Sequence, residues 1–316
     1  MSRSTARYIQ YDLRPVKQTE RRIMMDILRI ARDSGTEMSK YEYIGMGGIK
    51  FYDFEMFHRY LGVKSMISLE QDKEVVPRCR FNSPFGFIAI RNQTAGDFID
   101  GAKFSKPTII WLDYDWGLSK EVTSDVFALG SKLPAGSFVF VTVSGELPGA
   151  VKQLRVDDRV AHFRDELGVL SMDCSKADVE VENYPLYVER VIGGSLSSAF
   201  SARQEGKFSP LMRVVYRDTI WMATVGGCFC SDADGDAMRK KLESEFPFLY
   251  KGGEIPYRLS DLNFTPKERA LLDKVVTSEK DDEGTEQLKK LGLNKASVAA
   301  YKEVVRFLPR YVETFM

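Results

Sequence analysis

Short apolar segments alternate with amphipathic segments over the first half of the chain. Runs rich in branched or aromatic residues occupy 41–44, 65–69, 87–90, 108–112 and 137–143. Helical periodicity fills most of the gaps between them, at 54–61, 74–82 and 120–133. This alternation predicts βαβ units and a mostly parallel sheet that is buried on both faces. We therefore expect an α/β fold with a Rossmann-like, doubly wound sheet.

The regions on either side of these units follow other patterns. Val16 to Ala31 has apolar residues along one side and predicts an amphipathic helix, and further helices are expected at 151–167 and 183–203. Two β-rich runs, 211–216 and 219–225, flank the polar pair Arg217-Asp218. They predict a hairpin, and we expect this antiparallel pair to form the edge of the sheet.

From about Asp232 onward the chain is helical and more charged. Helices are expected at 237–245, at 265–276 with a Thr265-to-Glu268 start, and at 297–307, with a mobile acidic linker at 278–285. We divide the chain into an N-terminal helical segment (1–37), a Rossmann-like domain (38–231) and a helical C-terminal region (232–316). A chain trimmed after about Asp232 is expected to keep a folded core.

Composition excludes several classes of protein. Basic and acidic residues balance at 45 each, so no global field favours nucleic acid or an anionic membrane. The basic residues concentrated in the first forty positions could contact an anionic partner, but are interpreted as a solvated helix face. No apolar run is long enough to span a membrane, and the start lacks the apolar core of a signal peptide, which favours a cytoplasmic protein.

The number and spacing of cysteines and histidines do not indicate a metal site or a set of disulfide bonds. The four cysteines are scattered, and Cys228 and Cys230 share one face of a strand without a second pair of ligands. The chain has two histidines, and His58 is interpreted as a packed helix residue. We therefore expect no disulfides and no metal site, with one alternative considered below for two aspartates.

A glycine loop follows the first expected strand. Gly45-Met46-Gly47-Gly48 precedes a helix by a few residues, and the second expected strand ends in Glu70. Glycines let the backbone approach a ligand closely, and an acid after the second strand can accept hydrogen bonds from both hydroxyls of a ribose. The combination predicts a nucleoside-cofactor site, whereas the loop by itself could be a tight turn. Asp53, at the start of the helix, could cap it or meet an ammonium group of the ligand, and is interpreted as its cap.

Further acids follow the third and fourth strands. Asp97 can accept from an adenine amine while Phe98 packs on the ring; the alternative is a plain helix-capping aspartate. The fourth strand leads into Asp113-Tyr114-Asp115-Trp116, where ligands of open α/β sheets bind. These carboxylates are candidates for substrate orientation, proton abstraction or divalent-metal binding. Alternatively, Trp111 belongs to the core, Asp115 caps the next helix, and only Asp113 faces the pocket.

This order of motifs resembles the class I S-adenosylmethionine-dependent methyltransferases, and is similar to prokaryotic sequences labelled O-methyltransferases. The resemblance covers about residues 38 to 230. It implies S-adenosylmethionine as cofactor and assigns cofactor binding to eight residues: Gly45, Met46, Gly47, Gly48, Glu70, Gln71, Asp97 and Phe98. The end of the fourth strand would face the methyl group. Asp113 and Asp115 are then the catalytic candidates, with Tyr114 and Trp116 in contact with substrate.

The chain departs from the family pattern at two points. Ile49 stands where a third spaced glycine is usual, and the Asn/Asp-Pro-Pro-aromatic signature of many nucleic-acid amino-group methyltransferases is absent. We therefore expect transfer to a hydroxyl or another oxygen of a small or macromolecular acceptor, and do not favour nucleic acid.

Two other functions fit parts of the pattern. The fingerprint of a dinucleotide oxidoreductase has a third glycine at position 50. This chain has Lys50 there, which speaks against that function. A catalytically silent methyltransferase-like subunit would dock a partner protein through 232–316, with Tyr301, Phe307, Tyr311 and Phe315 as a docking surface. Those aromatics would equally suit packing against the sheet. Intact Glu70 and Asp97 speak against the silent subunit.

Overall fold

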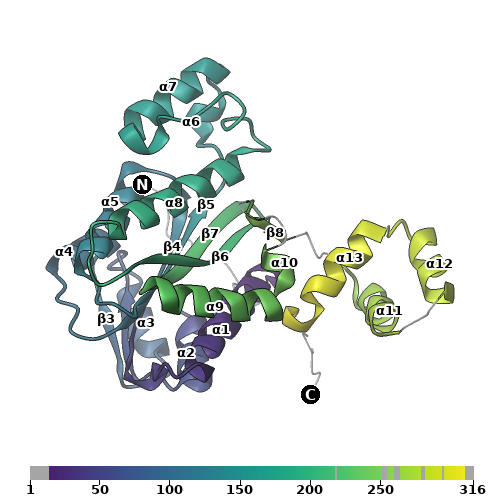
Figure 1. Cartoon of the computed structure of the whole chain (residues 1–316), viewed down its shortest axis with the longest axis horizontal. Coiled ribbons are helices and arrows are strands. Elements are labelled where there is room, and N and C mark those ends of the chain that lie inside the picture. The colour runs from purple at the N-terminus through teal and green to yellow at the C-terminus, as the bar shows by residue number, and fades with distance from the viewer. Residues whose placement is uncertain are drawn as a thin grey trace.

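The computed structural model in Figure 1 is built around one eight-stranded sheet with the order β3-β2-β1-β4-β5-β7-β6-β8. The structure describes residues 14–309 apart from 218, 251–252, 254, 260–263, 279–281 and 294. The strand order and the helices on both faces confirm the predicted Rossmann-like α/β fold.

The parallel half of the sheet contains the five strands that the apolar runs predicted. They are β1 (Glu42–Gly45), β2 (Ser65–Leu69), β3 (Ile88–Arg91), β4 (Thr108–Gly117) and β5 (Phe138–Ser144). The helices between them are α2 (Tyr52–Leu61), α3 (Val76–Asn82), α4 (Ala95–Gly101) and α5 (Lys120–Lys132). β4 continues to Gly117, past its expected end at Leu112, with a register shift against β5 between Asp113 and Gly117. This irregularity re-aims the side chains at the end of β4.

The antiparallel half contains the predicted hairpin and one unpredicted strand. β6 (Lys207–Arg217) and β7 (Trp221–Cys230) pair with each other, and β7 pairs antiparallel with β5. Arg217 pairs directly with Trp221, so the expected two-residue turn is wrong, and its Asp218 lies outside the described residues. β8 (Tyr257–Leu259) runs parallel to β6 and occupies the edge expected for the hairpin. It spans three residues, too few to give a periodic signal.

Helices cover the sheet on both faces (Figure 1). α1 (Pro15–Asp33), α2 and α9 (Asp232–Glu245) lie on one face, whereas α4, α5 and α8 (Tyr184–Phe200) lie on the other. Successive side chains of a strand point to opposite faces. Accordingly, Trp111 packs in the core beneath α1, and its neighbours Ile110 and Leu112 pack in the core beneath α5.

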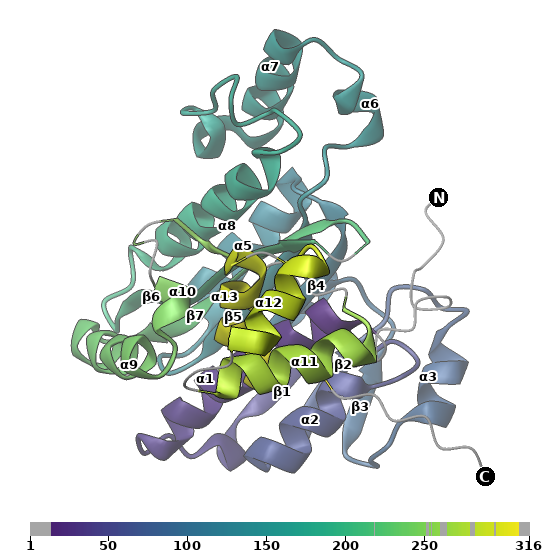
Figure 2. The ribbon, with the colours of Figure 1, turned by 90° about the vertical axis from the view of Figure 1, so that its right-hand side faces the viewer.

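The segment between β5 and α8 projects from the body (Figure 2). The single helix expected at 151–167 is wrong: the chain forms α6 (Gly149–Lys152) and α7 (Val156–Leu167) instead. Arg155, the residue before α7, has an extended backbone and forms no capping hydrogen bond with its side chain. The short η4 (Gly168–Ser171) follows α7, and η3 (Met38–Lys40) precedes β1.

The C-terminal region contributes to the same core as the sheet. Its elements are α9, α10 (Pro247–Tyr250), β8, α11 (Pro266–Thr277), α12 (Asp282–Lys290), α13 (Lys295–Val304) and η5 (Val305–Phe307). Thr265 and Glu268 form a capping box at the predicted start of α11. α12 begins within the segment expected to be a mobile linker, so that expectation is wrong from Asp282 onward.

Leu242, Phe246 and Leu259 are at most 1% exposed and belong to the core cluster that contains α1. This core cluster crosses the expected boundaries at 37/38 and 231/232, and the division of the chain into three parts stays a prediction. Tyr301 and Phe307 are buried, whereas Tyr311 and Phe315 lie outside the described residues. In the ranges that the structure describes, no helix is long and apolar enough to cross a membrane.

Candidate active site

The glycine loop is held against the end of β2. The backbone N–H of Gly47 donates to Ser68 Oγ at 3.1 Å, and that of Gly48 donates to Glu70 Oε1 at 2.9 Å. A Cβ on Gly47 would lie 2.8 Å from Ser68 Oγ and 2.9 Å from the rings of Phe51 and Phe54. Gly48 has a φ of +56°, which favours glycine. The loop thus needs glycines for close packing and for its backbone conformation.

Glu70 joins the loop to the sheet and remains on the wall of a cavity. Ser68 Oγ donates to the same Glu70 oxygen at 2.8 Å, and the side chain is 7% exposed. Burial raises the pKa of Glu70, although hydrogen bonds from Ser68, Gly48 and Cys79 oppose the shift. The carboxyl is therefore positioned by the loop itself, at the carboxyl end of β2.

The cavity lies beyond the carboxyl ends of β1, β2 and β4. Nine of the predicted site residues line it: Met46, Gly47, Gly48, Glu70, Gln71, Asp113, Tyr114, Asp115 and Trp116. Among residues not predicted, Arg21, Lys50, Tyr52 and Thr94 also line it, as does Asp53. The structure therefore brings together motifs that are far apart in the sequence.

Three predicted cofactor residues are not in the cavity wall. Gly45, Asp97 and Phe98 lie outside the lining, while Thr94 and Ala95 line it in their place. Thr94 is the N-cap of α4, accepting from Asp97 N at 3.1 Å and donating to Asp97 Oδ2 at 2.8 Å. Asp97 thus lies in the first turn of α4, and the alternative interpretation of Asp97 as the helix cap is wrong because Thr94 is the cap. Its contact with adenine stays a prediction.

The end of β4 presents two aromatics and two aspartates with different surroundings. Tyr114 is buried, and its hydroxyl donates to Asp125 Oδ2 at 2.6 Å. The ring of Trp116 packs edge-on against Tyr114, with centroids 5.0 Å apart. Asp115 is exposed at the cavity and does not cap α5, because Ser119 fills that position. Trp111 is 1% exposed, as expected for a core residue.

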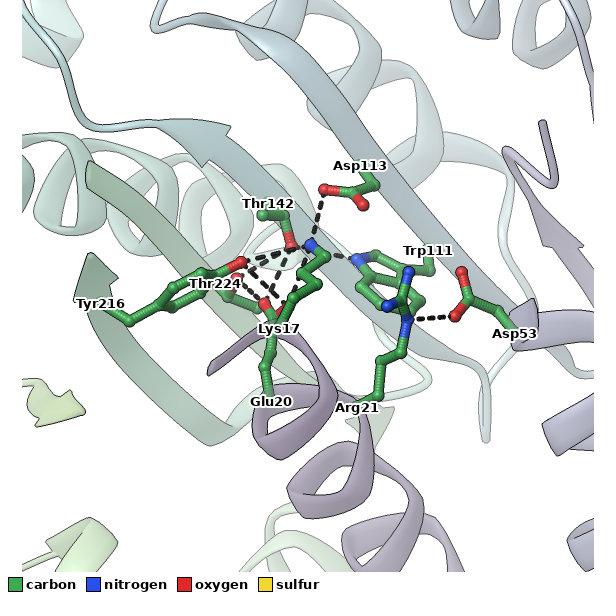
Figure 3. Close-up of polar contacts among 9 residues, drawn as sticks. All are labelled: Lys17, Glu20, Arg21, Asp53, Trp111, Asp113, Thr142, Tyr216 and Thr224. Carbon is green, nitrogen blue, oxygen red and sulfur yellow. Dashed lines mark hydrogen bonds and ion pairs between the residues drawn. The ribbon is translucent and has the colours of Figure 1, made fainter. Parts of the chain in front are cut away.

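Asp113 forms an ion pair with a lysine of α1 (Figure 3). Lys17 Nζ lies 2.9 Å from Asp113 Oδ1 and 2.9 Å from Glu20 Oε2. Tyr216 OH donates to Glu20 Oε2 at 2.9 Å, and Thr224 Oγ1 donates to the other oxygen of Glu20. Lys17 and Glu20 are 2% and 0% exposed. Burial opposes the charged ammonium, but the carboxylates of Asp113 and Glu20 outweigh it and raise the pKa of Lys17.

Arg21, one turn further along α1, reaches the cavity. Its Nε donates to Asp53 Oδ1 at 2.5 Å, and its guanidinium lies 5.8 Å from the ring centroid of Trp111. Burial works against the charge, yet the carboxylates of Asp53, Asp113 and Glu20 raise the pKa of Arg21. Asp53 therefore pairs with Arg21, and its interpretation as the cap of α2 is wrong: Phe51 occupies that position without a side-chain hydrogen bond.

The solvated basic face expected for α1 is also wrong for Lys17 and Arg21. Both are less than 5% exposed, on the same side of the helix as Met24 and Leu28. Positions 17, 21, 24 and 28 lie along one side of a helix. This spacing was the signal in the sequence that could have placed Lys17 and Arg21 on the buried side. From the neighbouring sequence alone, a lysine or an arginine is expected to face solvent. The partners that bury Lys17 and Arg21 lie in segments far away along the chain.

Two weaker candidates lie away from the cavity. His58 packs beside Phe85, with ring centroids 4.5 Å apart, and its Nδ1 lies 2.9 Å from the carbonyl oxygen of Val63, which confirms the packed-residue interpretation. Cys228 and Cys230 are buried free thiols. In the part of the chain that the structure describes, no three His, Cys, Asp or Glu side chains are grouped to hold a metal ion.

The strand order and the cavity together define a Rossmann-like α/β protein with a site of the kind that binds nucleoside cofactors. A family model described as "Putative O-methyltransferase" matches residues 9–316. The chain therefore belongs to this family, and the resemblance to S-adenosylmethionine-dependent methyltransferases is confirmed. No curated protein is significantly similar to the chain.

Several solved structures are similar in outline. N-methyltransferase NodS from Bradyrhizobium japonicum WM9, in complex with S-adenosyl-L-homocysteine, is 10% identical with a TM-score of 0.42, covering 70% of this chain and 90% of that one. Trm1 from Pyrococcus horikoshii with S-adenosyl-L-methionine is 12% identical with a TM-score of 0.46, covering 70% and 57%. A probable spermidine synthase from Corynebacterium glutamicum ATCC 13032 is 11% identical with a TM-score of 0.41, covering 81% and 76%. The scores are low, so no property of these proteins is carried over.

Proposed function

We propose that the cavity binds S-adenosylmethionine and that the protein transfers its methyl group to an oxygen nucleophile. The observation that carries this proposal is the charge of the lining. Six carboxylate side chains border the cavity (Asp53, Glu70, Asp72, Asp113, Asp115 and Glu121), against two cationic side chains, Arg21 and Lys50. An excess of carboxylates favours a sulfonium cation and disfavours the pyrophosphate of a dinucleotide. This argues against the oxidoreductase alternative.

Within the cavity, we assign Glu70 to the ribose hydroxyls. One oxygen of Glu70 already accepts from Gly48 N and Ser68 Oγ, so the carboxyl is fixed in place before a ligand arrives. The loop Gly45–Gly48 would hold the methionine part, with Gln71 beside the ribose. Asp97 and Phe98 remain assigned to the adenine side, reached through Thr94 and Ala95 at the cavity wall.

The chemistry at the end of β4 follows from its two aspartates. When bound, S-adenosylmethionine supplies a methyl group activated for in-line displacement. A hydroxyl acceptor must lose its proton as the new bond forms, and a carboxylate within hydrogen-bond reach can take it. Asp113 is held in orientation by Lys17, and Asp115 is exposed at the same cavity. We assign proton uptake to Asp113 first and to Asp115 second, with Tyr114 and Trp116 shaping the substrate side.

Two observations support an oxygen acceptor. The family to which the chain belongs is described as an O-methyltransferase family. Moreover, Asp113-Tyr114-Asp115-Trp116 replaces the proline-containing signature of many amino-group enzymes. The silent-subunit alternative is not favoured, because Tyr301 and Phe307, two of its proposed docking aromatics, are each 2% exposed and cannot form a docking surface.

Calorimetric titration of the full chain with S-adenosylmethionine, S-adenosylhomocysteine and NAD tests the cofactor assignment. We expect micromolar binding of the two sulfur compounds and no binding of NAD. Glu70→Gln keeps one oxygen acceptor for Gly48 and Ser68 but removes the carboxylate, and should weaken binding about tenfold or more. Ser68→Ala is the comparison variant, since it removes the hydrogen bonds of Ser68 to Gly47 and Glu70 but leaves the carboxylate. Unchanged affinity in Glu70→Gln would remove the ribose assignment; binding of NAD alone would overturn the proposed function.

A further inference from the structure

A second cavity lies along the same edge of the sheet as the proposed active site. It is lined by Glu146, Lys152, Val181, Glu182, Arg217, Trp221 and Arg258. These residues come from the turn after β5, from α6, from the loop before α8, and from β6, β7 and β8. Gly117, at the end of β4, pairs with Ser144, and a Cβ on Gly117 would lie 3.7 Å from the carbonyl oxygen of Glu146. The turn that lines the second cavity therefore lies next to the end of β4, whose residues 113–116 line the first.

Its floor is fixed by backbone contacts. Gly145 N donates to the carbonyl oxygen of Trp221 at 2.7 Å, and Trp221 N donates to Glu146 Oε1 at 3.0 Å. A Cβ on Gly145 would lie 3.1 Å from Pro185 and 3.2 Å from Trp221, so this turn is closely packed. Glu146 is thus used in holding β5 to β7.

The charge of this cavity differs in sign from that of the first. Lys152, Arg217 and Arg258 contribute three cations, against the carboxylates of Glu146 and Glu182. None of the three cations forms an ion pair with a carboxylate of a described residue. Arg258 Nη2 approaches the carbonyl oxygen of Glu182 at 3.5 Å. The lining therefore carries one more cation than carboxylates, and its three cations are exposed and available to an anion from solvent.

Trp221 holds the two guanidinium groups in position. Arg258 lies 5.0 Å and Arg217 6.0 Å from the centroid of the Trp221 ring. Such cation–π contacts restrict the side chains without neutralising them. Guanidinium groups present paired N–H donors that match the oxygens of a carboxylate or a phosphate. An anion at this position would meet donors from two strands that are already oriented.

We propose that this second cavity binds an anionic group, a phosphate or a carboxylate, of the methyl acceptor. The acceptor's hydroxyl would then lie toward Asp113 and Asp115, across the Gly117–Ser144 pair. The inference rests on the proposed function for its acceptor, whereas the anion site itself is a separate property of the chain. An anion site beside the proposed active site would restrict the methyl acceptor to molecules that carry both a hydroxyl group and a negative charge.

Titration of the full chain with inorganic phosphate and with citrate, in a buffer free of other multivalent anions, tests this site. Wild type should bind at least one of them saturably, and the tighter of the two assigns the class of anion. The double variant Arg217→Gln/Arg258→Gln should weaken that binding about tenfold or more, because charge-assisted hydrogen bonds are lost. Arg239→Gln is the matched control: Arg239 also stacks on an aromatic ring, 5.8 Å from the centroid of Tyr250, outside this cavity.

A parallel titration with S-adenosylhomocysteine separates the two proposals. Phosphate or citrate should bind equally well to protein saturated with S-adenosylhomocysteine, and the double variant should keep the wild-type affinity for that compound. The anion site is overturned if wild type shows no saturable binding, if the double variant binds as wild type does, or if S-adenosylhomocysteine displaces the anion. Absence of S-adenosylhomocysteine binding would count against the proposed function, while the anion titration would still report on the second cavity.

Discussion

Replacement of Lys17 by methionine tests whether the network beneath Asp113 is a balanced set of charges. Methionine preserves most of the apolar stem of lysine but removes the ammonium that lies 2.9 Å from both Asp113 and Glu20. Breaking a buried ion pair by removing one partner costs about 3–5 kcal/mol, because the remaining charge stays buried without compensation.

The structure places the expected loss toward the lower end of that range. Glu20 is 0% exposed, but it keeps hydrogen bonds from Tyr216 and Thr224, which partly stabilise its charge. The Asp113 side chain is 22% exposed, so water can hydrate it once Lys17 is gone. We therefore expect the free energy of unfolding to fall by about 3 kcal/mol, mostly through Glu20. Adding Glu20→Gln to Lys17→Met should restore part of that loss.

Urea unfolding at 25 °C, followed by circular dichroism, measures this change. Lys207→Met is the matched control: the Lys207–Asp232 pair has the same 2.9 Å separation but is 68% and 69% exposed, and should contribute at most about 1 kcal/mol. Because the pKa of Lys17 is raised, its contribution is fully present below its unfolded pKa and is lost only as the pH rises through the raised value. The result should therefore be the same at neutral and mildly alkaline pH. A loss as small as that of Lys207→Met would refute the balanced-charge reasoning.

Three further predictions concern the site and the core. Asp113→Asn should leave affinity for S-adenosylhomocysteine largely intact and slow methyl transfer about 10²–10⁴-fold, measured as release of that product; a fully active variant would exclude Asp113 as the base. Because burial raises the pKa of Glu70, cofactor affinity should already decline above pH 4.5 as the pH is lowered, and calorimetry should show this decline flattened in Glu70→Gln. Trimming the chain after Asp232 would remove β8 together with the buried Leu242 and Phe246, so the fragment should lose cooperative unfolding. A soluble, cooperatively unfolding fragment would contradict the shared core and restore the expectation drawn from sequence.

The sequence alone determined the elements whose signals are local. Apolar runs marked the five parallel strands, because a strand buried on both faces must be apolar along its length. The loop Gly45–Gly48 and Glu70 predicted one side of the cavity. Glycines after the first strand and an acid after the second are together typical of a nucleoside-binding site. The capping box at Thr265 likewise needs four residues of sequence and no tertiary partner.

Only the tertiary structure decided which charged residues are buried. Lys17 meets Asp113 and Tyr216 across 96 and 199 positions of the chain, and Glu20 meets Thr224 across 204. A charge is tolerated in the interior only when its desolvation is offset by such partners, and no local pattern reveals them. The second cavity is likewise assembled from Lys152, Arg217, Trp221 and Arg258, which belong to four different elements. Periodicity fixes what one element buries, whereas the order of strands in the sheet fixes which polar groups meet at its edge.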